Sequence, residues 1–228
     1  MADRPILFSG PMVRALLAGT KTQTRRVLKG SALAAREPQW EAKKGADGVW
    51  RLLAGTPDLS GSVVPDIRIA IGDRLYVREA WRCNGWATDV ATVMYRASEG
   101  DGYTAMTEQY PVEGKSPMRV TGTWRPGIHM PRWASRLTLT VTDVRVERLQ
   151  DCSNEDALAE GVVPVVHRVG GTTRYSATGD KFGLAQRTPK LAYAHLWDSI
   201  NGEDAWSENP WVAAYTFTVQ KGNIDAQA

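Results

Sequence analysis

Alternating apolar and polar residues predict strands at several places along the chain. The clearest case is 137–146, where leucine and valine alternate with threonine before the apolar phase slips by one residue to Val144 and Val146. Such a slip transfers the apolar set to the other face of a sheet, so we expect a β-bulge or bend near Asp143. The same patterns predict further strands at 5–8, 74–79, 91–95 and 212–219.

Apolar residues at helical spacing predict three short helices between these strands. The first begins at residues 10–11, and Gly19 is placed to end it in a left-handed conformation. The second covers 154–160 after a capping-box pattern, and the third covers 189–201. Strands and short helices together indicate an α+β chain.

Three long segments are interpreted as insertions, at 30–66, 83–118 and 162–188. The first is expected to contain loops or loops with a hairpin, and the second is a polar loop around the strand at 91–95. The chain has no internal repeat and no linker between two cores, so we expect a single domain over residues 1–228. A bend in the longest strand suits a small closed barrel. The pattern therefore predicts a small β-barrel with short flanking helices and long loop insertions.

The composition is that of a folded protein without a membrane span. Hydrophobic residues make up 43% of the 228 residues and charged residues 23%, which excludes disorder of the whole chain. No apolar stretch approaches the ~20 residues of a membrane span, and the N-terminus lacks the apolar core of a signal peptide. We expect a cytoplasmic protein in which Cys83 and Cys152 are free thiols.

The charges are unevenly distributed, although the net charge is only +3. Residues 1–30 contain six basic residues and one acidic residue, and residues 119–148 contain six arginines and two acidic residues. Residues 151–160 contain four acidic residues and no basic one. The two basic stretches either meet a phosphate-bearing partner or form solvated faces.

Nine tryptophans are present, and several must contribute to the core. Four of them lie beside arginine, glycine, asparagine or proline in segments typical of loops, namely Trp81, Trp86, Trp124 and Trp133. Aromatic rings among arginines can stack on a nucleobase. The alternative for each of the four is a place in the core or scaffold.

The chemistry that the sequence offers is concentrated at Lys21 and Thr24, three residues apart just after the first helix. Nucleotide-binding glycine loops, nucleophile elbows and zinc motifs are absent from the sequence, so neither a metal nor an organic cofactor is expected. A lysine whose pKa is lowered can take the proton of a threonine hydroxyl. The neighbouring Arg25 and Arg26 favour that lower pKa. The alternative is a basic loop that only binds anions.

Five pieces of the chain, in this order, resemble the ASCH family. They are LLAGTKTQTRRVLK, GDRLYVRE, HMPRWASRLTLTVTDVRVERLQD, SNEDALAEGV and LWDSINGEDAW…NPWV. ASCH proteins are small barrels related to the PUA domains that bind modified RNA. The arrangement is similar to that of the larger ASCH proteins common in phages and prophages.

The resemblance implies an activity and three catalytic residues. One branch of the family removes the acetyl group from N4-acetylcytidine, using a lysine and a threonine in an A-G-x-K-T-x-T-x-R loop and a glutamate in a later short helix. The corresponding residues are Lys21, Thr24 and Glu160. In this interpretation Thr24 attacks the acyl carbon, Lys21 carries the proton, and Glu160 sets the geometry of the lysine.

The resemblance also suggests substrate contacts, namely a stabilising charge from Arg25 or Arg26, a stacking ring from Trp81, and further contacts from Arg78 and Glu79. The expected ligand is a nucleoside or nucleobase. Other ASCH proteins have been linked to RNA binding or RNA cleavage. Two alternatives therefore stay open: a module that binds RNA or a modified nucleobase without catalysis, and a metal-independent ribonuclease.

Overall fold

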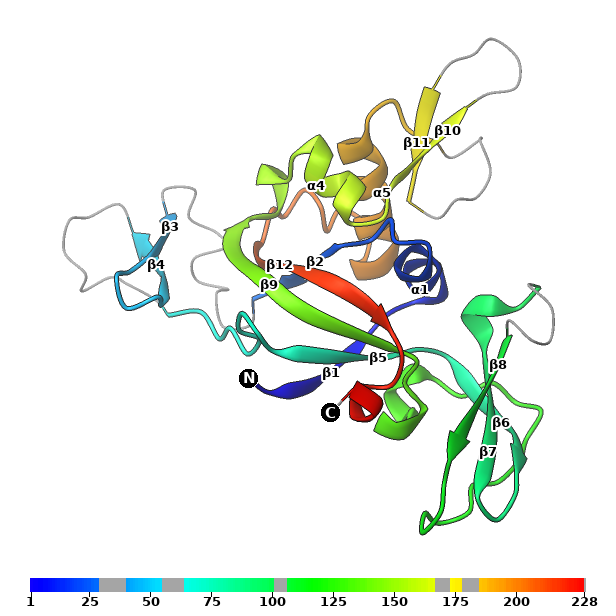
Figure 1. Cartoon of the computed structure of the whole chain (residues 1–228). Helices are drawn as coiled ribbons and strands as arrows, with labels where there is room; N and C mark the ends of the chain where they lie inside the picture. Colours follow the sequence, from blue (N-terminus) through cyan, green and yellow to red (C-terminus); the bar gives the residue numbers. More distant parts are fainter. Residues whose placement is uncertain (29–39, 55–63, 101–105, 167–172, 178–184, 228) are drawn as a thin grey trace. The chain divides into compact units, whose positions relative to one another are not determined.

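The structure, a computed structural model, describes residues 1–28, 40–54, 64–100, 106–166, 173–177 and 185–227. The described residues form a mixed α+β protein with many strands and few helices, which confirms the predicted class (Figure 1). Parts of all three predicted insertions lie outside the described residues. No described helix is both long and apolar enough to cross a membrane.

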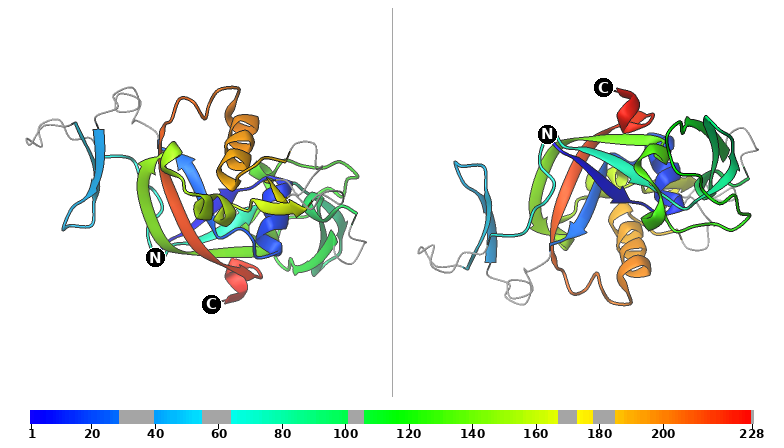
Figure 2. Two further views of the ribbon diagram at one scale, coloured as in Figure 1. Left: turned by 90° about the horizontal axis from the view of Figure 1, so that it is seen from above. Right: turned by 90° about the horizontal axis from the view of Figure 1, so that it is seen from below.

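The chain divides into two compact units. The first consists of residues 1–19, 72–140 and 218–228, and the second of residues 20–71 and 141–217. Two long strands, β9 (Leu137–Arg148) and β12 (Trp211–Lys221), contribute residues to both units (Figures 1 and 2).

The first unit pairs three strands and adds a separate small sheet. Strand β5 pairs with β1 in parallel and with the start of β9 in antiparallel orientation. The small sheet is antiparallel, with the order β6-β7-β8. The bounds are β1 (Asp3–Leu7), β5 (Arg74–Arg78), β6 (Trp81–Trp86), β7 (Val90–Tyr95), β8 (Thr107–Pro111), α1 (Gly10–Leu17), and the short 3-10 helices η2 (Arg96–Ser98), η3 (Gly127–His129), η4 (Arg132–Ala134) and η7 (Ile224–Gln227).

The second unit contains β2 paired antiparallel with β12, two hairpins and two helices. Its hairpins are β3–β4 and β10–β11. The bounds are β2 (Gln23–Val27), β3 (Trp40–Lys44), β4 (Trp50–Ala54), β10 (Val163–Val166), β11 (Thr173–Ser176), α4 (Asn154–Ala159), α5 (Pro189–Asn201) and the 3-10 helix η5 (Leu149–Asp151).

The strands that pair around β9 do not form the predicted closed barrel. Their hydrogen-bonded order is β1-β5-β9-β12-β2, and β1 and β2 have no common ladder among the described residues. The described strands therefore form an open five-stranded sheet.

The predicted strand at 91–95 is confirmed by β7, but the prediction that the rest of 83–118 is a polar loop is wrong, because this segment also contains β8 and most of β6. Two features hide the sheet from pattern analysis. The register shifts between Cys83 and Gly85, which breaks the alternation of β6. Strand β8 reads TEQYP, in which polar residues predominate and only the tyrosine is buried.

The predicted slip of the apolar phase in β9 is visible in the burial of its side chains. Leu139 and Val141 are buried, and after Asp143 the buried positions are Val144 and Val146. The strand itself is continuous. The slip falls close to position 141, where β9 passes from the first unit into the second.

The predicted helix ends are confirmed. The Ser153 hydroxyl accepts a hydrogen bond from the Asp156 backbone at 3.0 Å, and the Asp156 carboxylate accepts one from the Ser153 backbone at 3.1 Å. Gly19 and Gly161 have φ values of 74° and 100°, which glycine adopts without strain. Helix α4 packs with α5 around a core that includes Cys152, Ala157, Val162, Tyr193, Trp197 and Val212.

We expect Ser153→Ala to lower the free energy of unfolding by about 1 kcal/mol, because it removes the N-cap of α4. Urea unfolding followed by circular dichroism measures the change. Ser207→Ala, at an exposed turn position, is the matched control and should have little effect. Equal losses in the two variants would contradict a capping role.

Candidate active site

The loop after Gly19 is joined to the end of α4 through its backbone. Lys21 forms an isolated antiparallel bridge with Glu160, and the Thr22 N–H donates to the Ala159 carbonyl at 2.8 Å. Glu160 is the C-cap residue of α4. These backbone contacts hold the Lys21 loop and Glu160 next to each other.

Lys21 and Glu160 form a buried ion pair, although 139 positions separate them in the sequence. The Lys21 ammonium donates to Oε2 of Glu160 at 2.7 Å and to the Glu160 carbonyl at 2.8 Å. The exposed fractions of the two side chains are 0% and 2%. A charge in such surroundings is tolerated only with a close partner of opposite sign.

Arg25 connects Glu160 to two further carboxylates. Its guanidinium binds Glu147 Oε1 at 2.6 and 3.1 Å, Asp156 Oδ2 at 3.1 Å and Glu160 Oε1 at 3.3 Å. It also donates to the Gln23 side-chain carbonyl at 2.6 Å. Lys21, Arg25, Glu147, Asp156 and Glu160 thus form one buried cluster, with Arg25 at its centre. The sequence analysis instead expects Arg25 to contact the substrate.

Burial lowers the pKa of Lys21, which is the largest effect on this group. The charge and hydrogen bond of Glu160 oppose that change, while the nearby Arg26 and Arg25 add to it. Arg25 and Arg26 therefore lower the pKa of Lys21, as the sequence analysis expects. A lysine with a lowered pKa loses its proton more readily and is better suited to act as a base.

Two other groups close to the cluster are poor nucleophiles. Burial raises the pKa of the Cys152 thiol to about 12, so it is protonated at neutral pH. Burial also raises the pKa of Tyr193, whose ring centroid lies 5.9 Å from the Arg25 guanidinium carbon. Both cysteines are free, as expected, and both are buried.

Thr24 is also buried, but it occupies the other face of β2. Successive side chains of a strand alternate between faces, so Gln23 and Arg25 share one face, and Thr24 and Arg26 share the other. Thr24 pairs with Tyr215 of β12. The described contacts include no hydrogen bond between the Thr24 hydroxyl and Lys21 or Glu160. The structure thus brings two of the three predicted catalytic residues into contact.

A small cavity of about 160 Å³ lies on the Thr24 face of β2. Arg26, which is exposed, and Tyr215 contribute to its wall, together with Asp66, Arg68 and three apolar residues. Sites that enclose a small molecule usually have at least ~300 Å³. This cavity is therefore suited to part of a nucleoside and not to a whole one.

The other predicted substrate contacts belong to the first unit. Trp81 is completely buried in a core with Cys83, Val93 and Tyr95. It is therefore a core residue and not a ring exposed for stacking on a base. Glu79 is buried and accepts two hydrogen bonds from Arg136, at 2.9 and 3.0 Å. Arg78 donates to the Met130 carbonyl at 2.7 Å. All three have structural contacts within that unit.

The site also contains residues that sequence reasoning missed. Glu147, on β9, carries no signal in the sequence beyond its charge, and Tyr193 is one of several apolar or aromatic residues of the predicted helix 189–201. Asp156 was recognised as a capping residue, but its contact with Arg25 was not foreseen. Among the described residues, no group of three or more histidine, cysteine, aspartate or glutamate residues is arranged to hold a metal ion.

Arg25→Met is expected to lower the free energy of unfolding by about 3–5 kcal/mol, because it removes a buried cation that three carboxylates share and leaves Lys21 and Arg145 to neutralise them. Arg26→Met, at the neighbouring exposed position, is the matched control and should cost much less. Urea unfolding measures both. Similar losses would show that the three carboxylates do not depend on Arg25.

Asp156 should make stability depend on pH in the acid range. Burial opposes its ionisation, but hydrogen bonds from Arg145 and the Ser153 backbone and the charge of Arg25 prevail and hold its pKa at about 2. The stabilisation is present above the unfolded-state value near ~4 and is lost as the pH falls toward 2. Unfolding of Asp156→Asn should therefore vary less with pH in this window than that of wild type, whereas Glu203→Gln should behave like wild type.

Comparisons with known proteins assign no family to this chain. No protein-family model matches it, and neither the curated proteins nor the solved structures that were searched gave a match. The assignment of function therefore depends on the residues described above.

Proposed function

We propose that this protein is an amidohydrolase that removes the acyl group from an N4-acylated cytosine or cytidine, in the cytoplasm and on a scaffold related to the PUA-like ASCH barrels. One observation carries the proposal. The lysine and the glutamate that the ASCH resemblance pairs form a direct buried contact at 2.7 Å. The lowered pKa of Lys21 supports its use as a base.

In the proposed reaction, the Thr24 hydroxyl oxygen attacks the acyl carbon while its proton passes to unprotonated Nζ of Lys21. The bond from the acyl carbon to N4 then breaks, and Lys21 returns the proton to the departing amino group. Water next attacks the acyl-threonine ester and loses a proton to Lys21. The bond from the acyl carbon to the Thr24 oxygen then breaks, Lys21 returns the proton to that oxygen, and the carboxylic acid leaves. No metal or organic cofactor takes part in these steps.

Because Thr24 lies on the other face of β2, the mechanism requires the Lys21 loop to move, or one water to relay the proton from Thr24 to Lys21, when substrate is bound. Glu160 positions Lys21, and Arg25 in turn positions Glu160. Arg26 is the better candidate for a charge that stabilises the oxyanion, because it is exposed and lines the cavity on the Thr24 face.

A second candidate function is binding of RNA or a modified nucleobase without catalysis. The complete burial of Lys21 favours it, because a buried ion pair can be purely structural. Such a module would bind RNA with an affinity that falls with salt and on replacement of exposed basic residues such as Arg26. A metal-independent ribonuclease is the remaining alternative, and incubation with labelled RNA tests it.

The deciding experiment incubates the protein with N4-acetylcytidine and measures cytidine by chromatography. We expect Thr24→Ala and Glu160→Gln to reduce turnover by about 10²–10⁴-fold. Thr22→Ala, an exposed threonine two residues away, is the matched control and should keep its activity. Circular dichroism confirms that each variant folds. Absence of cytidine with wild-type protein, or full activity of Thr24→Ala, would overturn the proposal.

A further inference from the structure

Tyr215 of β12 lies directly opposite Thr24, the residue proposed to attack the acyl carbon. The two residues are partners in the antiparallel ladder of β12 and β2, and directly opposed residues of such a ladder share one face. Arg26 follows Thr24 by two positions and therefore lies on the same face. The ladder thus gathers a threonine hydroxyl, a phenol and a guanidinium on one face.

The hydroxyl of Tyr215 makes no hydrogen bond to the part of the protein that the structure describes. This is unusual, because the residue is only 4% exposed and a buried phenol normally finds a partner. Among the described residues, the fully enclosed polar side-chain atoms without a partner are the indole nitrogens of Trp50 and Trp81. The Tyr215 oxygen is not one of them, so it opens onto the cavity of about 160 Å³ whose wall Tyr215 forms with Arg26.

The charges around this cavity leave the phenol available as a donor. Burial raises the pKa of Tyr215, the charge of Arg26 opposes this rise, and the charge of Asp66 adds to it. Asp66 is itself bound by Arg68, whose Nε donates to Oδ2 at 2.8 Å. The hydroxyl therefore keeps its proton at neutral pH and has a cation near it.

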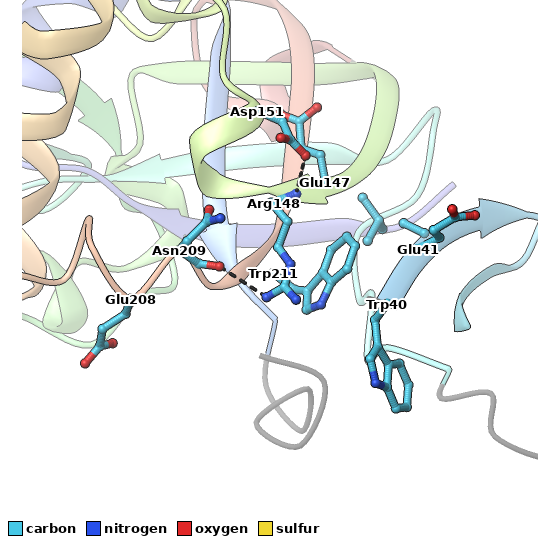
Figure 3. A pocket seen from close by; sticks show the side chains of 10 residues that line it. Trp40, Glu41, Glu147, Arg148, Asp151, Glu208, Asn209 and Trp211 are labelled. Atoms are coloured by element: carbon cyan, nitrogen blue, oxygen red, sulfur yellow. Dashed lines mark hydrogen bonds between the residues drawn. The ribbon is translucent and has the colours of Figure 1, made fainter. Parts of the chain in front are cut away.

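The larger cavity of the second unit, of about 700 Å³, is formed by other residues (Figure 3). Its wall includes Arg148, Trp211 and Glu147, the last of which binds Arg25 from the opposite face of β2. Arg26 and Tyr215, the neighbours of Thr24 on its own face, line the small cavity and not the large one. An acyl group that Thr24 attacks is therefore expected at the small cavity.

We propose that Tyr215 is a further catalytic residue, whose hydroxyl donates a hydrogen bond to the acyl oxygen of the substrate. When the Thr24 oxygen bonds to the acyl carbon, the electron pair of the carbonyl π bond moves to the acyl oxygen, which becomes negatively charged. The Tyr215 hydroxyl and the Arg26 guanidinium stabilise this charge, and the phenol proton stays on Tyr215. Donors that are in place before the reaction stabilise an oxyanion most effectively. This role rests on the proposed function and adds a second donor to Arg26.

Tyr215→Phe in the full chain tests this role, because it removes only the hydroxyl. With N4-acetylcytidine as substrate, kcat should fall about 10²–10³-fold and KM should change little, since an oxyanion donor acts mainly in the transition state. The urea midpoint should stay that of wild type, because the hydroxyl has no partner among the described residues. Tyr76→Phe, on β5 of the first unit, is the matched control and should keep both kinetic constants.

The wild-type rate separates the two claims. If wild-type protein forms no cytidine, the proposed function fails and this role fails with it. If wild type is active and Tyr215→Phe has the same kcat, the role of Tyr215 alone is overturned. A loss that appears mainly in KM, or together with a lower urea midpoint, also contradicts an oxyanion donor, because it indicates ground-state binding or folding.

Discussion

The second unit depends on the neutralisation of two buried cations. Lys21 and Arg25 are almost fully buried, and the carboxylates that pair with them come from β9 and from α4 with its C-cap. A buried charge without a partner costs several kcal/mol, so these elements must assemble together around β2. The capping box of α4 contributes to the same arrangement, because Asp156 both caps the helix and binds Arg25.

This cluster extends from the proposed base to the wall of a cavity. On one side, Glu160 binds Lys21, the proposed base. On the other side, Glu147 binds Arg25 and also lines the cavity of about 700 Å³. A change at Arg25 would therefore reach both Glu160 and this cavity wall.

The first unit shows how local sequence context misleads an assignment of function. Trp81 follows charged residues and resembles a ring exposed among polar neighbours, yet it is completely buried. Glu79 pairs with Arg136, whose guanidinium carbon also lies 4.0 Å from the centroid of the Tyr95 ring. These groups gain their partners from residues tens of positions away. Neighbours in the sequence cannot reveal such burial, because it arises when distant strands pack.

Neighbouring residues are enough to predict several features: the caps of α4, the left-handed glycines, the bounds of α5 and the alternation in β5, β9 and β12. The approach of Glu160 to Lys21 was expected only through resemblance to a family. Tertiary structure alone decided that Arg25 serves three carboxylates, that Thr24 lies on the other face of β2, and that Trp40 and Trp211 line one cavity. The reason is physical: these contacts join residues remote in the sequence, and their energies depend on burial and pairing that no local pattern encodes.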